Sequence, residues 1–335
     1  MPLFLALLRS ETAPQPERMR RALEGLRKYQ EAERAAPIPP MPAVAERMGA
    51  ALRDYGGAGP PVLFVPSLIN PPNILDLGPE RSLLRWLGGR AVRPLLLDWG
   101  WDVARRRGLS VSGHVEEIVA PLIEELGEKP ALVGYCLGGT MAMAAAARAE
   151  VRSVTAIAAP WHFSGFPEEA RAALARLWQE AEPIVRQLGM LPMEMLQAAF
   201  WSLDPARTVA KFERFAGMEG GEAQAFVRLE DWANDGPPLP EAAARELFED
   251  FFAADLPGRG EWRVSGRTIN PADLPCPLLD IVSTSDRIVP AASASGAGER
   301  LELAKGHVGM VVGSGAEEVL WEPLARWLSR TNPSC

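Results

Sequence analysis

The fold is decided by the stretch Ala131-Leu-Val-Gly-Tyr-Cys-Leu-Gly-Gly-Thr140. Its first half has the apolar character of a short buried strand, and an alanine-rich segment typical of a helix follows it. Gly134 and Gly138 lie two residues on either side of Cys136. This spacing is typical of a nucleophile elbow, a tight strand-to-helix turn at which glycines let the two elements approach closely. The N-terminus of the following helix favours thiolate over thiol, so Cys136 is a candidate nucleophile, whereas an inert buried cysteine is the alternative.

Short apolar segments alternate with helical segments on both sides of this stretch. We expect strands at residues 62–65, 94–99, 131–135, 154–158, 277–282 and 301–303. We expect helices at residues 80–88, 112–126, 139–149 and 316–329. Continuous apolar strands that alternate with helices predict an α/β fold with a mostly parallel, doubly wound sheet.

Composition limits the classes of function that the chain can have. The 335 residues carry a formal net charge of −8, which argues against a nucleic-acid partner because no basic stripe is present. Three widely spaced cysteines suit a reducing compartment and form neither a disulfide framework nor a zinc pattern. No apolar run has the length of a transmembrane segment, and the apolar residues 3–8 make a poor signal peptide. We therefore expect a cytoplasmic protein without a metal site or a cofactor.

Changes in the pattern along the chain divide it into three parts. Residues 1–55 are expected to form an N-terminal helical arm with an amphipathic helix at 15–35 and a proline-rich connector. The α/β core is expected to comprise residues 56–161 and 267–335. Between them, residues 162–266 have helical segments and no convincing strand, with breaks at Pro192, 217–221 and 236–238. Such a block inside an α/β sheet is typical of a cap or lid, so we expect a helical cap insertion.

A base and an acid for Cys136 are available in later loops. His307 lies in a glycine-flanked loop directly after an expected strand, and Asp286 also follows a strand. The order nucleophile, acid, base along the chain is that of α/β-hydrolase folds. Since open α/β sheets build their sites at the carboxyl ends of strands, we predict a Cys136–His307–Asp286 catalytic triad.

The remaining histidines and cysteines are weaker candidates for catalysis. His114 is expected on a helix in a surface or capping role, and His162 opens the expected cap, where it either lines a pocket or is structural. Cys276 lies between two prolines without a glycine elbow, and Cys335 ends the sequence.

An oxyanion hole would use backbone N–H groups close to the nucleophile. The residue after the nucleophile supplies one donor, and the loop after the first core strand supplies the other. We therefore expect the N–H groups of Leu137 and Leu68, with Ile69 as the next choice, because Pro66 has no N–H.

The residues around the elbow resemble the polyhydroxyalkanoate (PHA) synthases, an α/β-hydrolase-type family with cysteine in place of serine in the lipase-like box. The matching segments are residues 66–77, 82–87, 97–100, 227–232, 247–252, 285–290 and 306–310. The resemblance runs from about residue 60 to the C-terminus and is strongest to the short synthases that act with a second subunit. It implies a synthase partner subunit or a homodimer, and attachment to polyester granules.

The resemblance also implies an activity. A 3-hydroxyacyl-CoA thioester would acylate Cys136, and a hydroxyl acceptor would take the acyl group. The sequence departs from the family at Pro71, Pro72 and Asn73, and residues 110–115 lack the Asp-Tyr pair that is common in the synthases. Two alternatives therefore stay open: a thioesterase or ester hydrolase with the same triad, and a non-catalytic subunit that binds granules or a partner.

Overall fold

The computed structural model describes residues 2–36 and 38–332. The chain forms two compact units. The first joins the N-terminal residues up to Pro39 with Met193–Asp235, and the second joins Pro40–Pro192 with the chain from Gly236 onward.

The second unit is built on a sheet of eight strands in the order β1-β2-β4-β3-β5-β6-β11-β12. The strands are β1 (Ala43–Arg47), β2 (Ala50–Asp54), β3 (Pro61–Val65), β4 (Arg93–Asp98), β5 (Ala131–Tyr135), β6 (Ser153–Ile157), β11 (Leu278–Ser283) and β12 (Glu299–Leu303). Neighbours from β4 to β12 pair in parallel, whereas β1 with β2 and β2 with β4 are antiparallel. The prediction of a mostly parallel α/β sheet is confirmed.

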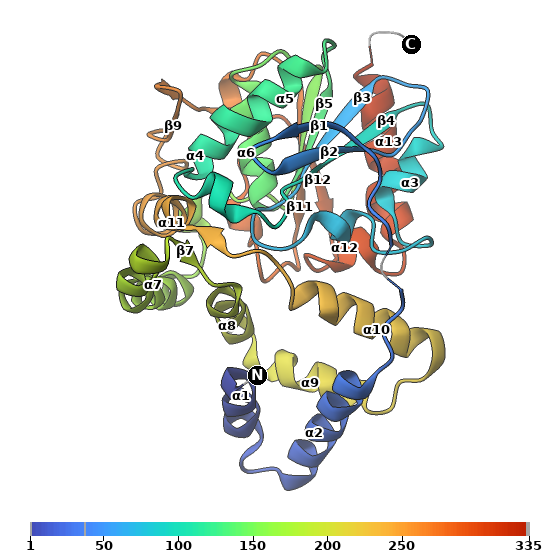
Figure 1. The fold of residues 1–335 in the computed structure, drawn as a ribbon, viewed down its shortest axis with the longest axis vertical. Helices are drawn as coiled ribbons and strands as arrows, with labels where there is room; N and C mark the ends of the chain where they lie inside the picture. The colour runs from blue at the N-terminus through green and yellow to red at the C-terminus, as the bar shows by residue number, and fades with distance from the viewer. Residues whose placement is uncertain (1, 37, 333–335) are drawn as a thin grey trace. The chain divides into compact units, whose positions relative to one another are not determined.

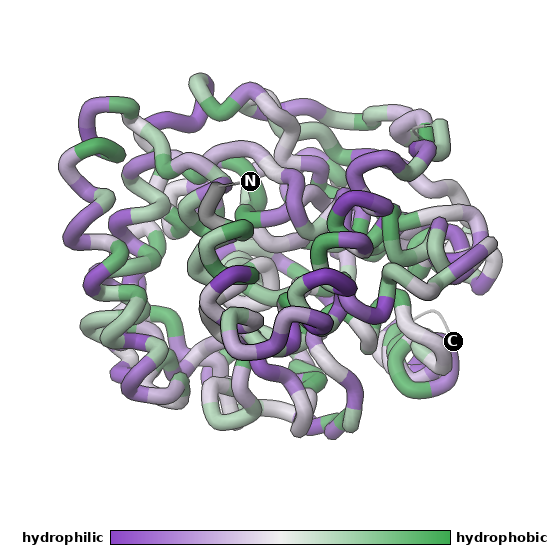
Figure 2. The backbone as a smooth tube through the Cα atoms, turned by 90° about the horizontal axis from the view of Figure 1, so that it is seen from below, coloured by the Kyte–Doolittle hydropathy of each residue, from purple (hydrophilic) through white to green (hydrophobic). Residues whose placement is uncertain are grey.

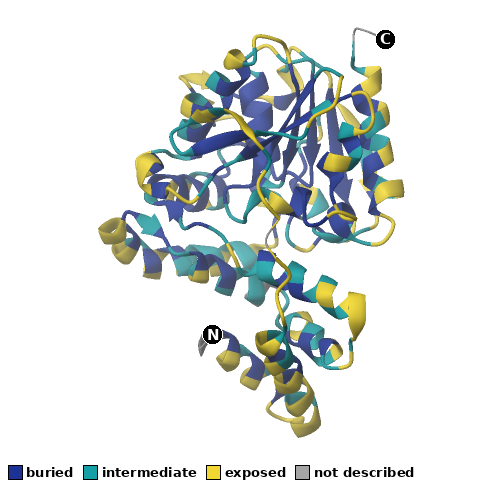
Figure 3. Cartoon of the chain, turned by 45° about the vertical axis from the view of Figure 1, so that its right-hand side comes forward, coloured by how far each residue is buried: buried dark blue, intermediate teal, exposed yellow. Residues whose placement is uncertain are grey.

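The central strands are buried on both faces, as the dark strands in Figure 3 show. Helices α5 (Ala120–Glu125) and α6 (Leu137–Ala146) lie on one side of the sheet, and α3 (Leu83–Gly88) and α13 (Glu322–Arg330) lie on the other (Figure 1). Parallel sheets need this double cover because both of their faces are apolar. Along α13, hydrophobic and hydrophilic residues alternate (Figure 2), so the helix buries one side.

Further helices complete the second unit. They are α4 (Val111–His114), α7 (Glu168–Leu188), α11 (Glu241–Arg245) and α12 (Gly309–Val312). A π-helical turn at Val115–Val119 joins α4 to α5, so the helix predicted at 112–126 is continuous in the structure. Two short antiparallel pairs, β7 (Met190–Leu191) with β8 (Leu239–Pro240) and β9 (Arg263–Val264) with β10 (Arg267–Thr268), lie outside the main sheet.

The antiparallel strands β1 and β2 correct the expected N-terminal arm, which was assigned no strands. A tight turn at Met48 and Gly49, both with positive φ, connects the two strands. β1 is the edge strand and is mostly exposed, so it lacks the apolar run that marks a buried strand. The core therefore begins near residue 43 instead of 56.

The first unit is built from helices. It contains α1 (Pro2–Thr12), α2 (Pro16–Glu31), α8 (Met193–Leu203), α9 (Pro205–Phe215) and α10 (Gly220–Ala233). Its buried core comprises Phe4, Leu8, Ala22, Leu26, Val209 and Phe212. Gly25 permits the close approach of α2 and α9, because a Cβ there would lie 1.9 Å from the carbonyl oxygen of Phe212. The amphipathic helix predicted at 15–35 is α2, whereas α1 was not predicted.

The segment expected to form the cap, residues 162–266, is divided between the two units. Residues 193–235 pack with the N-terminal helices, and residues 162–192 and 236–266 belong to the unit that contains the sheet. The boundaries fall at Pro192 and Gly236, at two of the three breaks in the sequence, and the break at 217–221 lies within the first unit. Amphipathic helices reveal that one face is buried but not which distant helix buries it, so the sequence pattern gave a single block.

Candidate active site

Cys136 occupies a strained turn between β5 and α6. Its backbone has φ 56° and ψ −131°, a conformation that residues with a Cβ rarely adopt. The turn is held on both sides, because the Cys136 N–H donates to Ile157 O (2.9 Å) and the Gly139 N–H donates to Cys136 O (2.8 Å). Strain that the surrounding structure enforces at a partly buried thiol is typical of a functional residue.

The two glycines that flank Cys136 are required by space. A Cβ on Gly134 would lie 2.4 Å from the backbone of both Gly138 and Gly139. A Cβ on Gly138 would lie 2.0 Å from Val65 O, at the end of β3. Helix α6 therefore rests directly on the strand before it and on the loop after β3, which fixes the position of the thiol.

His307 and Asp286 meet at the carboxyl end of the sheet. The His307 Nδ1 lies 2.6 Å from Asp286 Oδ2. The other carboxylate oxygen of Asp286 accepts from the backbone N–H groups of Ile288 (2.8 Å) and Val289 (3.1 Å). Both side chains are at least nine-tenths buried. Three donors thus hold the carboxylate in one orientation, and the carboxylate orients the imidazole.

The charge of the Cys136 side chain also acts on the imidazole of His307. Burial by itself lowers the pKa of His307, but the charge of Cys136 and the hydrogen bond to Asp286 outweigh it and raise the pKa to about 10. The geometry therefore favours the imidazolium form of His307, beside the Asp286 carboxylate and the Cys136 side chain. The structure brings together the three residues of the predicted triad; their catalytic roles stay a prediction.

The residues expected to form the oxyanion hole lie close to the elbow. Leu137 is the first residue of α6, and Leu68 lies in the buried loop after β3 that Gly138 allows to approach. The N–H of Ile69 donates to Ser67 Oγ (3.2 Å), which favours Leu68 over Ile69 as the second donor. The assignment of these two donors stays a prediction.

The other histidines and cysteines lie in different surroundings. His114 is fully buried, so the expected surface role is wrong; its Nδ1 lies 2.7 Å from Ser110 O, and burial lowers its pKa to about 4. His162 precedes a 3₁₀ turn, and its N–H donates to Ser293 O (3.0 Å). Burial raises the pKa of the Cys276 thiol to about 11, which disfavours a thiolate. Cys335 lies outside the described residues.

Two residues around His307 were not singled out from the sequence. Tyr135 stacks on the imidazole with ring centroids 4.9 Å apart, and its hydroxyl donates to His307 O (3.1 Å). The hydroxyl of Ser283 donates to Lys305 O, in the same loop. Tyr135 directly precedes the nucleophile, and this position at the end of a strand is the signal that could have identified it.

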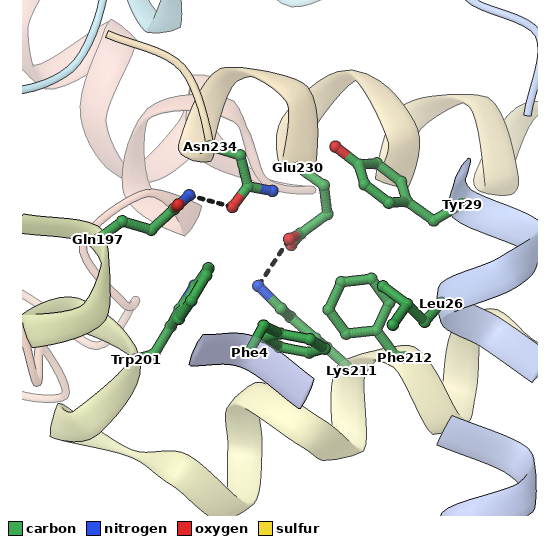
Figure 4. A pocket seen from close by; sticks show the side chains of 9 residues that line it. All are labelled: Phe4, Leu26, Tyr29, Gln197, Trp201, Lys211, Phe212, Glu230 and Asn234. Atoms are coloured by element: carbon green, nitrogen blue, oxygen red, sulfur yellow. Dashed lines mark hydrogen bonds and ion pairs between the residues drawn. The ribbon is translucent and has the colours of Figure 1, made fainter. Parts of the chain in front are cut away.

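The first unit contains a separate pocket of about 230 Å³. Figure 4 shows aromatic side chains that include Phe4, Trp201 and Phe212 around a central ion pair. Lys211 Nζ lies 2.6 Å from Glu230 Oε2, and the Gln197 amide donates to Asn234. These polar groups pair with one another, so we interpret the pocket as the polar centre of a helical core.

No described helix combines the length and the low charge that would let it cross a membrane, counting residues 2–36 and 38–332.

Comparison with known proteins identifies the family and the relatives that this chain resembles. The model of the alpha/beta hydrolase family matches residues 62–320. The chain is 28% identical to the poly(3-hydroxyalkanoate) polymerase subunit PhaC of Haloarcula marismortui, over 85% of this chain and 64% of that protein. It is also 28% identical to the subunit of the same name from Haloferax mediterranei, over 80% of this chain and 58% of that protein. The chain thus spans less than two thirds of the length of these two relatives.

Solved structures agree on the fold. An epoxide hydrolase from Bacillus megaterium aligns with a TM-score of 0.54 and 16% identity, and the match covers 84% of this chain and 99% of the hydrolase. At this identity the likeness concerns the fold alone. The family model covers the sheet strands from β3 to β12 and all three residues of the predicted triad. The chain therefore belongs to the alpha/beta hydrolase family and is similar in sequence to poly(3-hydroxyalkanoate) polymerase subunits.

Proposed function

We propose that the protein is a PHA-synthase-like acyltransferase that forms an acyl-Cys136 intermediate from a 3-hydroxyacyl-CoA. The observation that carries the proposal is the buried hydrogen bond of His307 with Asp286 (2.6 Å), at an imidazole on which the charge of Cys136, on its strained turn, also acts. The similarity to poly(3-hydroxyalkanoate) polymerase subunits supports the substrate class.

The first half-reaction transfers the acyl group to the enzyme. The Cys136 thiolate attacks the thioester carbonyl, and the N–H groups of Leu137 and Leu68 stabilise the oxyanion. The bond from the acyl carbon to the CoA sulfur breaks, and CoA leaves as a thiol with the proton of the His307 imidazolium. Attack by one sulfur and departure of another keeps the acyl-enzyme as reactive as the substrate, since both are thioesters.

The second half-reaction passes the acyl group to a hydroxyl. His307, now neutral, removes the proton of the acceptor while the hydroxyl oxygen attacks the acyl-Cys136 carbonyl. The carbon–sulfur bond breaks, the Cys136 thiolate is restored, and His307 is an imidazolium again. Asp286 orients the imidazole throughout. The substrate is a CoA thioester, and these steps use only side chains and backbone N–H groups.

The test follows the products of 3-hydroxybutyryl-CoA with the purified protein. We expect CoA thiol to appear together with turbidity from polymer, and Cys136→Ala to abolish both. Free thiol with soluble 3-hydroxybutyrate would instead identify a hydrolase, in which water is the acceptor. If no thiol appears, with or without a candidate partner subunit, the protein does not use this substrate, and a non-catalytic role gains support.

A further inference from the structure

We propose that Tyr135 is the positioning residue that holds His307 beside the Cys136 side chain, through its ring face. This inference rests on the proposed function, because it names what holds the base of that reaction in place. Neither the family match nor the similarity to the polymerase subunits assigns a role to this side chain.

Tyr135 contacts His307 from a distant part of the sequence. It is the last residue of β5, and His307 lies 172 residues further along the chain, in the loop after β12. The ring centroids are 4.9 Å apart and the planes meet at 28°, so the faces overlap. Tyr135 is 4% exposed, which excludes water from the contact. Because the next residue is Cys136, one rigid backbone carries both the nucleophile and the support of its base.

The ring face favours the charged form of His307. An aromatic face carries a partial negative potential that attracts a cation, and the attraction is stronger where water is excluded. The charged groups that act on the imidazole are Cys136 and Asp286. Tyr135 adds an uncharged contact to these two, because burial, together with the charges of Cys136 and Asp286, raises its own pKa well above the usual 10.

The hydroxyl acts on the loop instead of the imidazole. It donates to the carbonyl oxygen of His307 (3.1 Å), two residues beyond Lys305, whose carbonyl accepts from the Ser283 hydroxyl. The loop that carries the base is thus anchored at two carbonyls by side chains from β5 and β11. Because the two contacts of Tyr135 differ in chemistry, two substitutions can separate them.

The experiment compares wild type with Tyr135→Phe, which keeps the ring face, and Tyr135→Leu, which removes it. The first measurement is the NMR titration of the His307 ring in isotope-labelled protein, with the signal assigned by His307→Asn. The expected midpoint for Tyr135→Leu is lower by about one pH unit, a tenfold change in proton affinity, whereas Tyr135→Phe titrates like wild type.

The second measurement is the rate at which iodoacetamide alkylates Cys136 at pH 7, with Cys136→Ala to subtract the reaction of other cysteines. Only the thiolate reacts, and the imidazolium favours it. We expect alkylation to be about tenfold slower in Tyr135→Leu and near the wild-type rate in Tyr135→Phe. Thermal unfolding of each variant shows whether the fold is retained, and Tyr135→Met, which also lacks the ring face, replaces Tyr135→Leu if that variant does not fold.

Two results would overturn the inference. If the His307 midpoint and the Cys136 alkylation rate of Tyr135→Leu equal those of wild type, Tyr135 only fills space in the core. Equal losses in the Phe and Leu variants would show that the ring face has no role of its own. Neither measurement needs a substrate, so a wild-type protein that fails to release CoA would count against the proposed function and leave this test intact.

Discussion

Two histidines of the sheet-containing unit are almost entirely buried, yet their pKa values shift in opposite directions. Burial lowers the pKa of both. At His307 the charge of Cys136 and the hydrogen bond to Asp286 reverse the effect and raise the pKa to about 10. At His114 the hydrogen bond to Ser110 only partly offsets burial, and Arg106 adds to it, so the pKa falls to about 4.

The difference shows that charged partners, and not burial alone, set the direction in which the pKa of each histidine shifts. His307 lies between an oriented carboxylate and a thiol. His114 packs edge-on against Trp99 at 5.6 Å, and its Nε2 has no hydrogen-bond partner within the part of the chain that the structure describes. A neutral imidazole fits these surroundings, whereas an imidazolium would be a buried charge without a counterion.

The largest expected effect separates the two histidines by activity. His307→Asn should lower the rate of CoA release from 3-hydroxybutyryl-CoA about a hundredfold to ten-thousandfold, the usual contribution of a general base. His114→Gln should leave the rate near that of wild type, because His114 contacts none of the three predicted triad residues in the structure's hydrogen bonds and ring contacts. Steady-state kinetics of both variants give the comparison. Equal losses would mean that the contrast in pKa has no bearing on catalysis.

The next effect concerns stability in acid. The folded pKa of His114, about 4, lies below its ordinary value of 6.5. Between these values the unfolded chain binds a proton that the folded chain does not, so stability is complete above pH 6.5 and falls as the pH drops toward 4. The loss is about 3 kcal/mol. Urea unfolding of His114→Gln should therefore show a weaker pH dependence than wild type in this range.

The control for this stability measurement is His307→Asn. The folded pKa of His307 is about 10, so the folded imidazole stays protonated between pH 4 and 6.5. The unfolded imidazole, with its ordinary pKa of 6.5, is mostly protonated over the same range. Its replacement should leave the steep acid dependence in place. If His307→Asn flattens the curve and His114→Gln does not, the assignment of opposite shifts to the two sites is reversed.

The sheet and the meeting of the three predicted triad residues could be predicted from the sequence, because both depend on local patterns. Apolar runs mark strands that are buried on both faces, and parallel strands end at one edge of the sheet. Cys136 and Asp286 follow such strands, and His307 follows β12, which is mostly exposed but pairs in parallel with β11, so their meeting could be expected before the structure. The edge strand β1 has no such run, and for this reason the hairpin with β2 was missed.

Contacts between distant segments could not be predicted in this way. The packing of residues 193–235 with the N-terminal helices depends on close fits such as that of Gly25 against Phe212, which leave no pattern along the chain. The burial of His114 was missed for a related reason. Trp99 and Arg106, in the segment between β4 and α4, fold back toward His114, and no periodic pattern marks this contact. The stacking of Tyr135 on His307 likewise joins residues far apart in the sequence.

The smallest effect tests the cause of the high pKa of His307 directly. Cys136→Ser keeps a side chain of similar shape but removes the charge that is the largest of the causes raising this pKa. The NMR midpoint of His307 should fall by about one pH unit or more, while Asp286 continues to favour the imidazolium. In wild type, the stability that the protonated His307 contributes is complete below pH 6.5 and is lost as the pH rises through about 10. In Cys136→Ser, this contribution to stability should be lost at a lower pH. An unchanged midpoint would mean that Asp286 alone sets the charge of His307, and Cys136 would then have to be activated by the helix N-terminus without an ion pair.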